Sequence, residues 1–187
     1  SDITLVPWSG DTKNITKLNV SLGDWAYDFT DDGYRYCRQV KILDGKRELT
    51  SSEFKTENTY TKNGDFKQVK ITGVGMYKGT VILTADGKVK APAVPKLASL
   101  KAGNASFTAK VKKVSYASGY QLQYSTSSKF TKKTTKTVTL YNSGSLKKTV
   151  KKLTRGKKYY IRLRSFKTAN GKTVYSKWSK TKTVKTK

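Results

Sequence analysis

The chain has 187 residues, of which 39 are Lys or Arg, 12 are Asp or Glu and none is His, so its formal net charge is +27. The absence of His and the presence of a single cysteine, Cys37, exclude Ser-His and Cys-His catalytic pairs, zinc sites built from Cys and His, and an intrachain disulfide. A catalytic pair of carboxylates needs a cleft, and the strand-rich sequence described below offers no obvious one. We expect no catalytic residue, no metal site, no cofactor and no enzymatic activity.

The charge is divided unevenly along the chain. Residues 1–90 hold 14 basic residues and all 12 acidic ones, whereas residues 91–187 hold 25 basic residues and no acidic one. Two prolines in the segment 91–95 favour a stiff, extended connector at this break. The sequence predicts a first domain over 1–90, a linker over 91–95 and a second domain over 96–187.

Strand-forming residues dominate the first half. Thr, Val, Ile and Tyr are frequent, and turn residues recur about every 8–12 residues, a pattern typical of an all-β sandwich or barrel. Asp-Gly and Asn-Gly pairs mark hairpin turns between several of the segments. We predict strands over 36–43, 54–60, 66–72 and 77–84. The segments 3–6 and 15–22 are further strand candidates, but residues 1–33 are otherwise unassigned.

The second half alternates between apolar and polar residues with a period of two. Tyr120, Leu122 and Tyr124 fall on one side of a predicted strand, and Tyr159, Ile161 and Leu163 fall on one side of another, so both sets are predicted to face the core. Seven strands result, which is the number in an immunoglobulin-like sandwich. They are predicted over 96–100, 106–111, 119–125, 135–141, 146–150, 158–166 and 174–184.

Four segments of the second half resemble fibronectin type III domains of Gram-positive bacterial surface proteins. They are Gly-Tyr-Gln-Leu-Gln-Tyr-Ser at 119–125, Leu-Thr-Arg-Gly-Lys-Lys-Tyr at 153–159, Ile-Arg-Leu-Arg at 161–164 and Tyr-Ser-Lys-Trp-Ser at 175–179. The resemblance covers 96–187 and implies a tyrosine corner at Tyr159, whose hydroxyl would bond to upstream backbone.

Residues 34–90 resemble, more weakly, the immunoglobulin-like or glycan-associated repeats of such bacterial proteins. The similar segments are Leu-Asp-Gly at 43–45, Ile-Thr-Gly-Val-Gly at 71–75 and Tyr-Lys-Gly-Thr at 77–80. The predicted fold class is therefore all-β, with two β-sandwich-like domains in tandem, of which the second is a seven-stranded fibronectin type III sandwich.

Arg162, Arg164 and Trp178 form the first candidate site. Alternate residues of a strand lie about 7 Å apart on one face, so a Trp on the neighbouring strand can stack between the two guanidinium groups. Such a ladder either binds anions or stiffens the sheet.

Aromatic residues crowd the N-terminal part of the chain. Tyr36 is one of them, and four others, Trp8, Trp25, Tyr27 and Tyr34, are the candidates for stacking on sugar rings. Four nearby carboxylates, Asp24, Asp28, Asp31 and Asp32, would accept hydrogen bonds from sugar hydroxyls. The alternative is that these residues belong to the core and to turns.

The lysines of the second domain have no acidic neighbour in sequence, so they project a positive field. Teichoic acids, anionic glycans, phospholipid headgroups and nucleic acids would all be attracted to it, unless the lysines merely form a solvated face. Specific nucleic-acid binding is not expected, because no reader motif is present.

These features predict a non-catalytic extracellular module of a secreted or cell-wall-associated bacterial protein. It would space the flanking domains of a larger protein and adhere to anionic wall polymers or host glycans. The alternative is an accessory or carbohydrate-binding module of an extracellular hydrolase whose catalytic domain lies outside this sequence. No apolar run is long enough for a transmembrane helix or a signal peptide, so we expect neither here.

Overall fold

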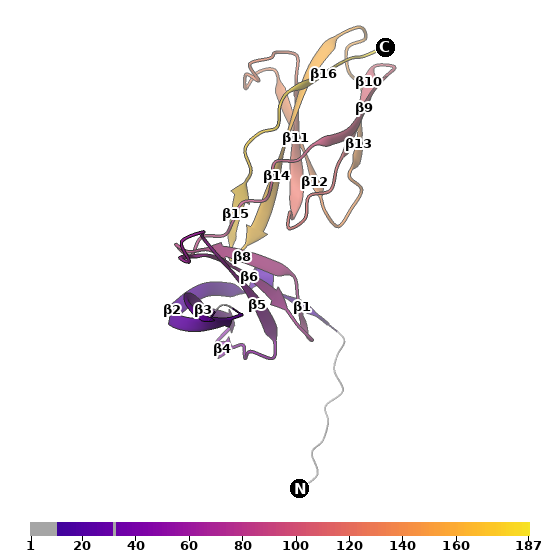
Figure 1. Cartoon of the computed structure of the whole chain (residues 1–187). Helices are drawn as coiled ribbons and strands as arrows, with labels where there is room; N and C mark the ends of the chain where they lie inside the picture. Colours follow the sequence, from indigo (N-terminus) through magenta and orange to yellow (C-terminus); the bar gives the residue numbers. More distant parts are fainter. Residues whose placement is uncertain (1–10, 32) are drawn as a thin grey trace. The chain divides into compact units, whose positions relative to one another are not determined.

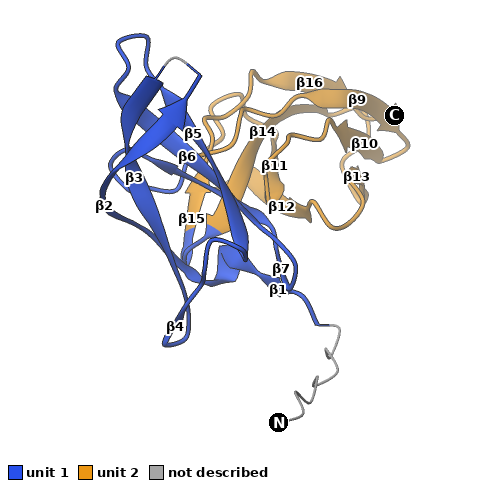
Figure 2. Ribbon diagram, turned by 60° about the horizontal axis from the view of Figure 1, so that its bottom comes forward, with its two compact units in different colours: residues 1–90, 169–172 blue, residues 91–168, 173–187 orange. Residues whose placement is uncertain are grey.

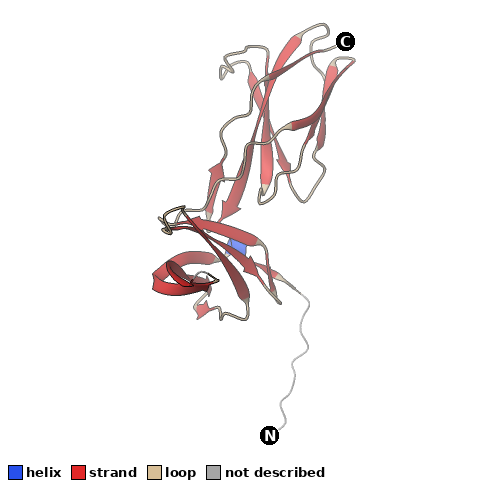
Figure 3. Ribbon diagram, in the orientation of Figure 1, coloured by secondary structure: helices blue, strands red, loops and turns tan. Residues whose placement is uncertain are grey.

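A computed structural model of the chain describes residues 11–31 and 33–187, and it consists almost entirely of β-strands (Figures 1 and 3). The chain forms two compact units (Figure 2). Unit 1 comprises the chain up to Lys90 together with Ala169–Lys172, and unit 2 comprises Ala91–Thr168 and Thr173–Lys187. The predicted strand over 3–6 lies outside the described residues. None of the helices in the described part of the chain has the length and apolar character needed to cross a membrane.

Unit 1 contains two three-stranded antiparallel sheets and a short parallel pair. The first sheet has the order β2–β3–β4, with the strands Asn19–Thr30, Gly33–Asp44 and Arg47–Glu48. The second has the order β5–β6–β8, with the strands Phe54–Tyr60, Phe66–Gly73 and Thr80–Thr84. The parallel pair joins β1, Lys13–Asn14, to β7, Tyr77–Lys78.

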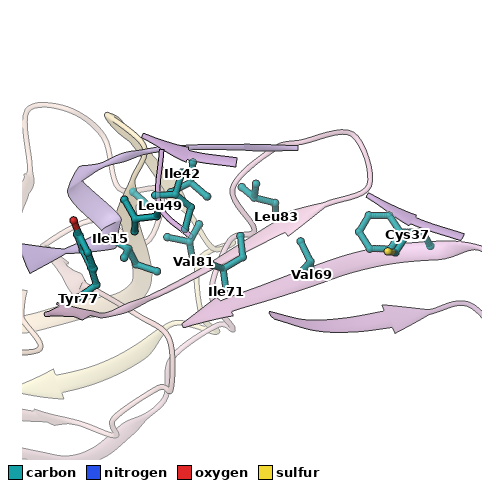
Figure 4. Packing of buried hydrophobic residues seen from close by; sticks show 12 residues of the cluster. Ile15, Cys37, Ile42, Leu49, Val69, Ile71, Tyr77, Val81 and Leu83 are labelled. Carbon is teal, nitrogen blue, oxygen red and sulfur yellow. The ribbon is translucent and has the colours of Figure 1, made fainter. Parts of the chain in front are cut away.

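The core of unit 1 lies between its two sheets. Ile42 from the first sheet and Val69 and Val81 from the second are fully buried in one cluster (Figure 4). Val20 of the first sheet is fully buried in the same cluster. Ala169, the last residue of β14, is buried in the same cluster. Unit 1 is therefore a sandwich-like fold, and its core includes a residue about 85 positions beyond the end of β8. Sequence reasoning assigned this residue to the second domain, because nothing local marks it as a core element of the first.

The predicted strand over 15–22 is wrong in its first half. Ile15–Lys17 form a single 3-10 turn, η1, and β2 begins at Asn19. The Asn14 side chain accepts a hydrogen bond from the Thr16 N–H at 3.0 Å and so caps this turn. Similarly, the strand predicted over 77–84 is split into β7 and β8 by Gly79, which has a φ of +92°.

Unit 2 is a two-sheet sandwich with the strand arrangement expected of a fibronectin type III-like fold. One sheet has the order β13–β10–β9, with the strands Lys147–Val150, Ser106–Val111 and Leu97–Gly103. The other has the order β12–β11–β14, with the strands Thr135–Tyr141, Gly119–Ser125 and Lys158–Ala169. The last predicted strand is two strands, β15 (Lys172–Tyr175) and β16 (Lys182–Lys185), and both pair with β14.

The alternation seen in the sequence places the core of unit 2 correctly. Tyr120, Leu122, Ile161 and Leu163 are fully buried. Tyr159 is also buried, and its hydroxyl accepts a hydrogen bond from the Thr154 N–H at 3.2 Å. The tyrosine corner implied by the resemblance is therefore present in the structure.

Lys167 continues the inward-facing positions of β14 and is buried. Its Nζ lies 4.4 Å from the centre of the Tyr116 ring. Burial lowers the pKa of Lys167 from 10.5 to about 8, because the charged ammonium is poorly solvated there.

Replacing Lys167 by Met should stabilise the protein by about 1–3 kcal/mol at pH 7, where the buried ammonium is charged. The unfolded chain binds this proton more tightly than the folded one, so wild-type stability should rise as the pH increases from 8 to 10.5. The difference in free energy of unfolding between Lys167→Met and wild type should therefore decrease over this pH range. Urea unfolding at several pH values measures this difference, and a difference independent of pH would contradict the lowered pKa of Lys167.

Candidate functional site

One face of the β2–β3 hairpin carries five exposed aromatic rings, which we call the aromatic face. They are Trp25, Tyr27, Phe29, Tyr34 and Tyr36, and their exposed fractions run from 55% for Tyr27 to 84% for Phe29. Tyr27 stands opposite Tyr36, and Phe29 stands opposite Tyr34. A contiguous exposed apolar surface of this kind marks an interaction site more often than a passive surface. The structure thus brings together three of the four predicted stacking residues, while Trp8 lies outside the described residues.

A β-bulge marks the point where the outward positions of β3 change. On β2 the three rings lie on the side opposite to buried Val20, as plain alternation predicts. On β3, plain alternation from buried Ile42 would turn Tyr36 and Tyr34 toward the core. Gly23 and Asp24 of β2, however, face the single residue Gln39 of β3, and beyond this bulge the buried positions of β3 change from even-numbered to odd-numbered, whereas those of β2 do not. Cys37 therefore becomes the buried residue.

Arg38 stabilises this bulge from the aromatic side. Its Nε donates a hydrogen bond to the Gly23 carbonyl at 2.6 Å, and its guanidinium lies 5.3 Å from the centre of the Trp25 ring. The Tyr27 and Tyr36 rings are tilted against each other at 4.8 Å, and their hydroxyls are 3.1 Å apart. The aromatic face is thus held in place by contacts among its own members.

A hollow of about 550 Å³ adjoins the aromatic face. It is lined by Trp25, Tyr34, Arg35, Tyr36, Gly64, Asp65 and Phe66. Rings together with a guanidinium and a carboxylate offer both stacking and hydrogen bonding, which is the combination that fixes a polar ring-shaped ligand. Sequence reasoning missed Arg35 and Asp65 as members of this group, because Asp65 belongs to the connection between β5 and β6, which only the folded chain brings beside β3.

The aspartates predicted to accept hydrogen bonds from sugar hydroxyls differ in exposure and in hydrogen bonding. Asp24 and Asp31 are exposed, while Asp32 lies outside the described residues. Asp28 is instead committed to the protein, since its Oδ2 accepts hydrogen bonds from Asn58 at 2.9 Å and from the Tyr60 hydroxyl at 2.6 Å.

Cys37, near Asp28, is a buried thiol. Burial and the nearby Asp28 carboxylate raise the pKa of the Cys37 thiol, so it stays protonated and packs as an apolar residue.

Arg162, Arg164 and Trp178 are also brought together. Each guanidinium lies between two rings: Arg162 is 4.1 Å from the centre of Phe130 and 4.4 Å from that of Trp178, and Arg164 is 4.5 Å from Trp178 and 3.9 Å from Tyr175. Trp178 therefore stands between both cations, as the spacing predicts. Phe130 and Tyr175 extend the ladder at its two ends.

Hydrogen bonds hold the ladder to the neighbouring strand. The Nε of Arg162 donates to Gln123 Oε1 at 2.9 Å, and the Nε of Arg164 donates to Gln121 Oε1 at 2.8 Å. Burial and the neighbouring Arg164 lower the pKa of Arg162. Because rings cover both faces of each guanidinium, only the guanidinium edges are left for an anion, which favours the structural interpretation of the ladder.

The remaining basic residues of 91–187 form a cationic surface. Apart from half-buried Arg162 and Arg164 and buried Lys167, all of them are exposed. This part of the chain contains no side-chain carboxylate to neutralise them. Among the described residues, no group of His, Cys, Asp and Glu side chains is placed to hold a metal ion.

Comparison with known proteins gives only distant similarity. No protein-family model matches the chain, and no curated protein sequence matches it. The chain is similar to the FN1–FN3 domains of chicken CNTN1, with 16% sequence identity over 90% of this chain and 53% of that one and a TM-score of 0.44. It therefore spans about half of the CNTN1 structure.

Two further solved structures are similar at the same level. The chicken interferon gamma receptor alpha chain has 10% identity over 89% of this chain and 98% of that one, with a TM-score of 0.41. A β-1,2-glucanase from Parabacteroides distasonis has 14% identity over 92% of this chain and 25% of that one, with a TM-score of 0.40.

Replacing Trp178 by Ala should destabilise the protein by about 1–2 kcal/mol, because both guanidiniums lose one of their two rings. Tyr141→Ala removes an exposed ring of unit 2 that is not part of the ladder and serves as the control. Thermal unfolding measures both variants. Equal melting temperatures for Trp178→Ala and wild type would show that the ladder does not stabilise the sheet.

Proposed function

We propose that this chain is a non-catalytic extracellular module of a secreted or cell-wall-associated bacterial protein, which spaces neighbouring domains and binds glycans through the aromatic face of unit 1. The observation that carries the proposal is the aromatic face itself, five rings exposed beside a hollow lined by Arg35 and Asp65. The resemblance of 96–187 to fibronectin type III domains of Gram-positive surface proteins supports the cellular setting.

Glycan binding fits the chemistry of this surface better than burial against another apolar surface does. The aromatic face is not uniformly apolar, because it includes the hydroxyls of Tyr27, Tyr34 and Tyr36. A sugar presents an apolar ring face and a rim of hydroxyls, and such a ligand can stack on a ring and bond to the charged groups beside it. The same surface would serve an accessory module of an extracellular hydrolase, since the two roles differ in the neighbouring domains and not in this chemistry.

A second function, adherence to anionic wall polymers, is favoured by a separate observation. Residues 91–187 expose nearly all of their 25 basic residues and contain no acidic one. An unpaired field of this kind attracts polyanions without sequence or shape selectivity, and salt weakens the attraction.

Replacing both Trp25 and Tyr34 by Ala should weaken glycan binding by about 1–3 kcal/mol, because two stacking rings beside the hollow are lost. A glycan array probed with the whole chain, followed by calorimetry on the best ligand, measures the effect. The control is Tyr141→Ala in unit 2, whose ring has a similar exposure. Unchanged affinity in the double variant, with its fold intact by circular dichroism, would exclude this surface as the glycan site.

Retention of the whole chain on immobilised teichoic acid should be strong at about 0.05 M salt and lost by about 0.5 M, because the screening length falls below the spacing of exposed charges. Retention on an uncharged dextran support under the same conditions is the control. Failure to bind teichoic acid even at the lower salt concentration would rule out charge-mediated adherence.

A further inference from the structure

A second hollow, of about 400 Å³, lies in unit 2 and is lined by three lysines, Lys133, Lys136 and Lys152. We propose that this lysine hollow is a discrete binding site for a phosphate group, such as the repeating phosphate of a wall polymer. The proposal builds on the charge-mediated adherence described above and gives it a specific place.

The position of the hollow follows from the strand register. Lys136 of β12 stands opposite Tyr124 of β11, and the next inward pair along these strands is Val138 with Leu122. Lys136 therefore occupies an inward-facing position at the end of the sandwich, where the core opens to solvent. The connection between β13 and β14 contributes Lys152 and Thr154 to the same hollow.

The three ammonium groups are available to a ligand. None of them has a hydrogen-bond or ion-pair partner within the part of the chain that the structure describes. No side-chain carboxylate exists in residues 91–187 to compete for them. Three lysines around one hollow without a counter-ion favour a small anion of high charge density, and Lys binds phosphate as a point charge.

Neutral donors surround the cations. The Tyr124 ring packs against Phe107 at 5.6 Å and Tyr159 at 6.4 Å, while its hydroxyl has no partner among the described residues. Burial raises the pKa of Tyr124, so this hydroxyl stays protonated and can donate. The hydroxyls of Thr126 and Thr154 line the same hollow. A tetrahedral oxyanion can accept from several such donors at once, which a diffuse field of surface lysines does not offer.

The backbone fixes Lys152 in an uncommon conformation. Its φ is +59°, in the left-handed region that residues with a side chain seldom adopt. The tyrosine corner anchors this connection two residues later, where Thr154 N–H donates to Tyr159. The backbone that carries Lys152 is thus held in place by the fold.

The test compares two double variants with the same change in net charge. Lys136→Gln with Lys152→Gly removes two cations from the hollow, and Gly relieves the left-handed backbone at 152, so the fold should be retained. Lys110→Gln with Lys147→Gln removes two exposed cations that stand opposite each other on β10 and β13, away from the hollow. Each whole chain is titrated with inorganic phosphate at constant ionic strength, and amide NMR shifts are recorded.

Phosphate should produce saturable shifts at the amides of Tyr124, Thr126 and Thr154 in wild type and in the Lys110/Lys147 variant. In the Lys136/Lys152 variant its affinity should fall about tenfold or more, as expected for the loss of charge-assisted hydrogen bonds. Acetate at equal ionic strength distinguishes a site shaped for a tetrahedral oxyanion from general attraction of anions. Equal affinities in the two double variants, non-saturating shifts spread over all lysines, or equally strong acetate binding would overturn the proposal.

A parallel retention assay on teichoic acid separates this proposal from the function on which it builds. Selective loss of retention in the Lys136/Lys152 variant would support both. Retention that falls equally in the two variants would leave charge-mediated adherence standing and overturn the discrete site. A phosphate titration that localises to the hollow, without any retention of wild type on the polymer, would support the site and exclude the polymer as its ligand.

Discussion

Unit 2 folds without any carboxylate side chain within residues 91–187, and the arrangement of its cations follows from this. A cation that cannot form an ion pair must stay in water or find another electron-rich partner. Most of the lysines stay in water. The half-buried guanidiniums of Arg162 and Arg164 lie between aromatic rings and donate to glutamine oxygens, and the buried Lys167 lies against the Tyr116 ring with a lowered pKa. Rings and amides thus replace the ion pairs of an ordinary sheet surface.

In unit 1, several cations form ion pairs with carboxylates instead. Arg47 donates to both oxygens of Glu53, at 3.0 and 2.7 Å, and also to the Tyr77 hydroxyl, while Asp44 accepts from Lys13 and Tyr77. The Arg47 guanidinium and the Thr50 N–H lower the pKa of Glu53 to about 2. These contacts gather at β1, β4 and β7, whereas the aromatic face lies on the far part of the β2–β3 hairpin. The charged network and the aromatic face therefore occupy different parts of the same sheet system.

The periodicity of apolar residues predicts many of the strands of this fold. The features that it does not predict are those that depart from a regular repeat. β5, β10, β11 and β12 match the predicted ranges, because each is a run of strand-forming residues between clear turns. The bulge at Gly23 and Asp24, the 3-10 turn at Ile15 and the burial of Ala169 in unit 1 depend on contacts distant in sequence. The Arg162–Trp178–Arg164 ladder was predictable from spacing on one strand. The two hollows were not, since each joins segments that only the folded chain brings together.

The cationic surface and the lysine hollow differ in what they can select. A field of exposed lysines responds to the charge density of a polymer, so any polyanion satisfies it and salt weakens every one alike. The hollow adds shape, because Lys136 occupies an inward-facing register position beside Tyr124 at the open end of the core. A tetrahedral oxyanion there can accept from ammonium and hydroxyl donors at once, which a single surface ammonium does not offer. Selectivity in a chain of this charge therefore depends on where the fold groups a few cations with neutral donors, and not on the number of cations.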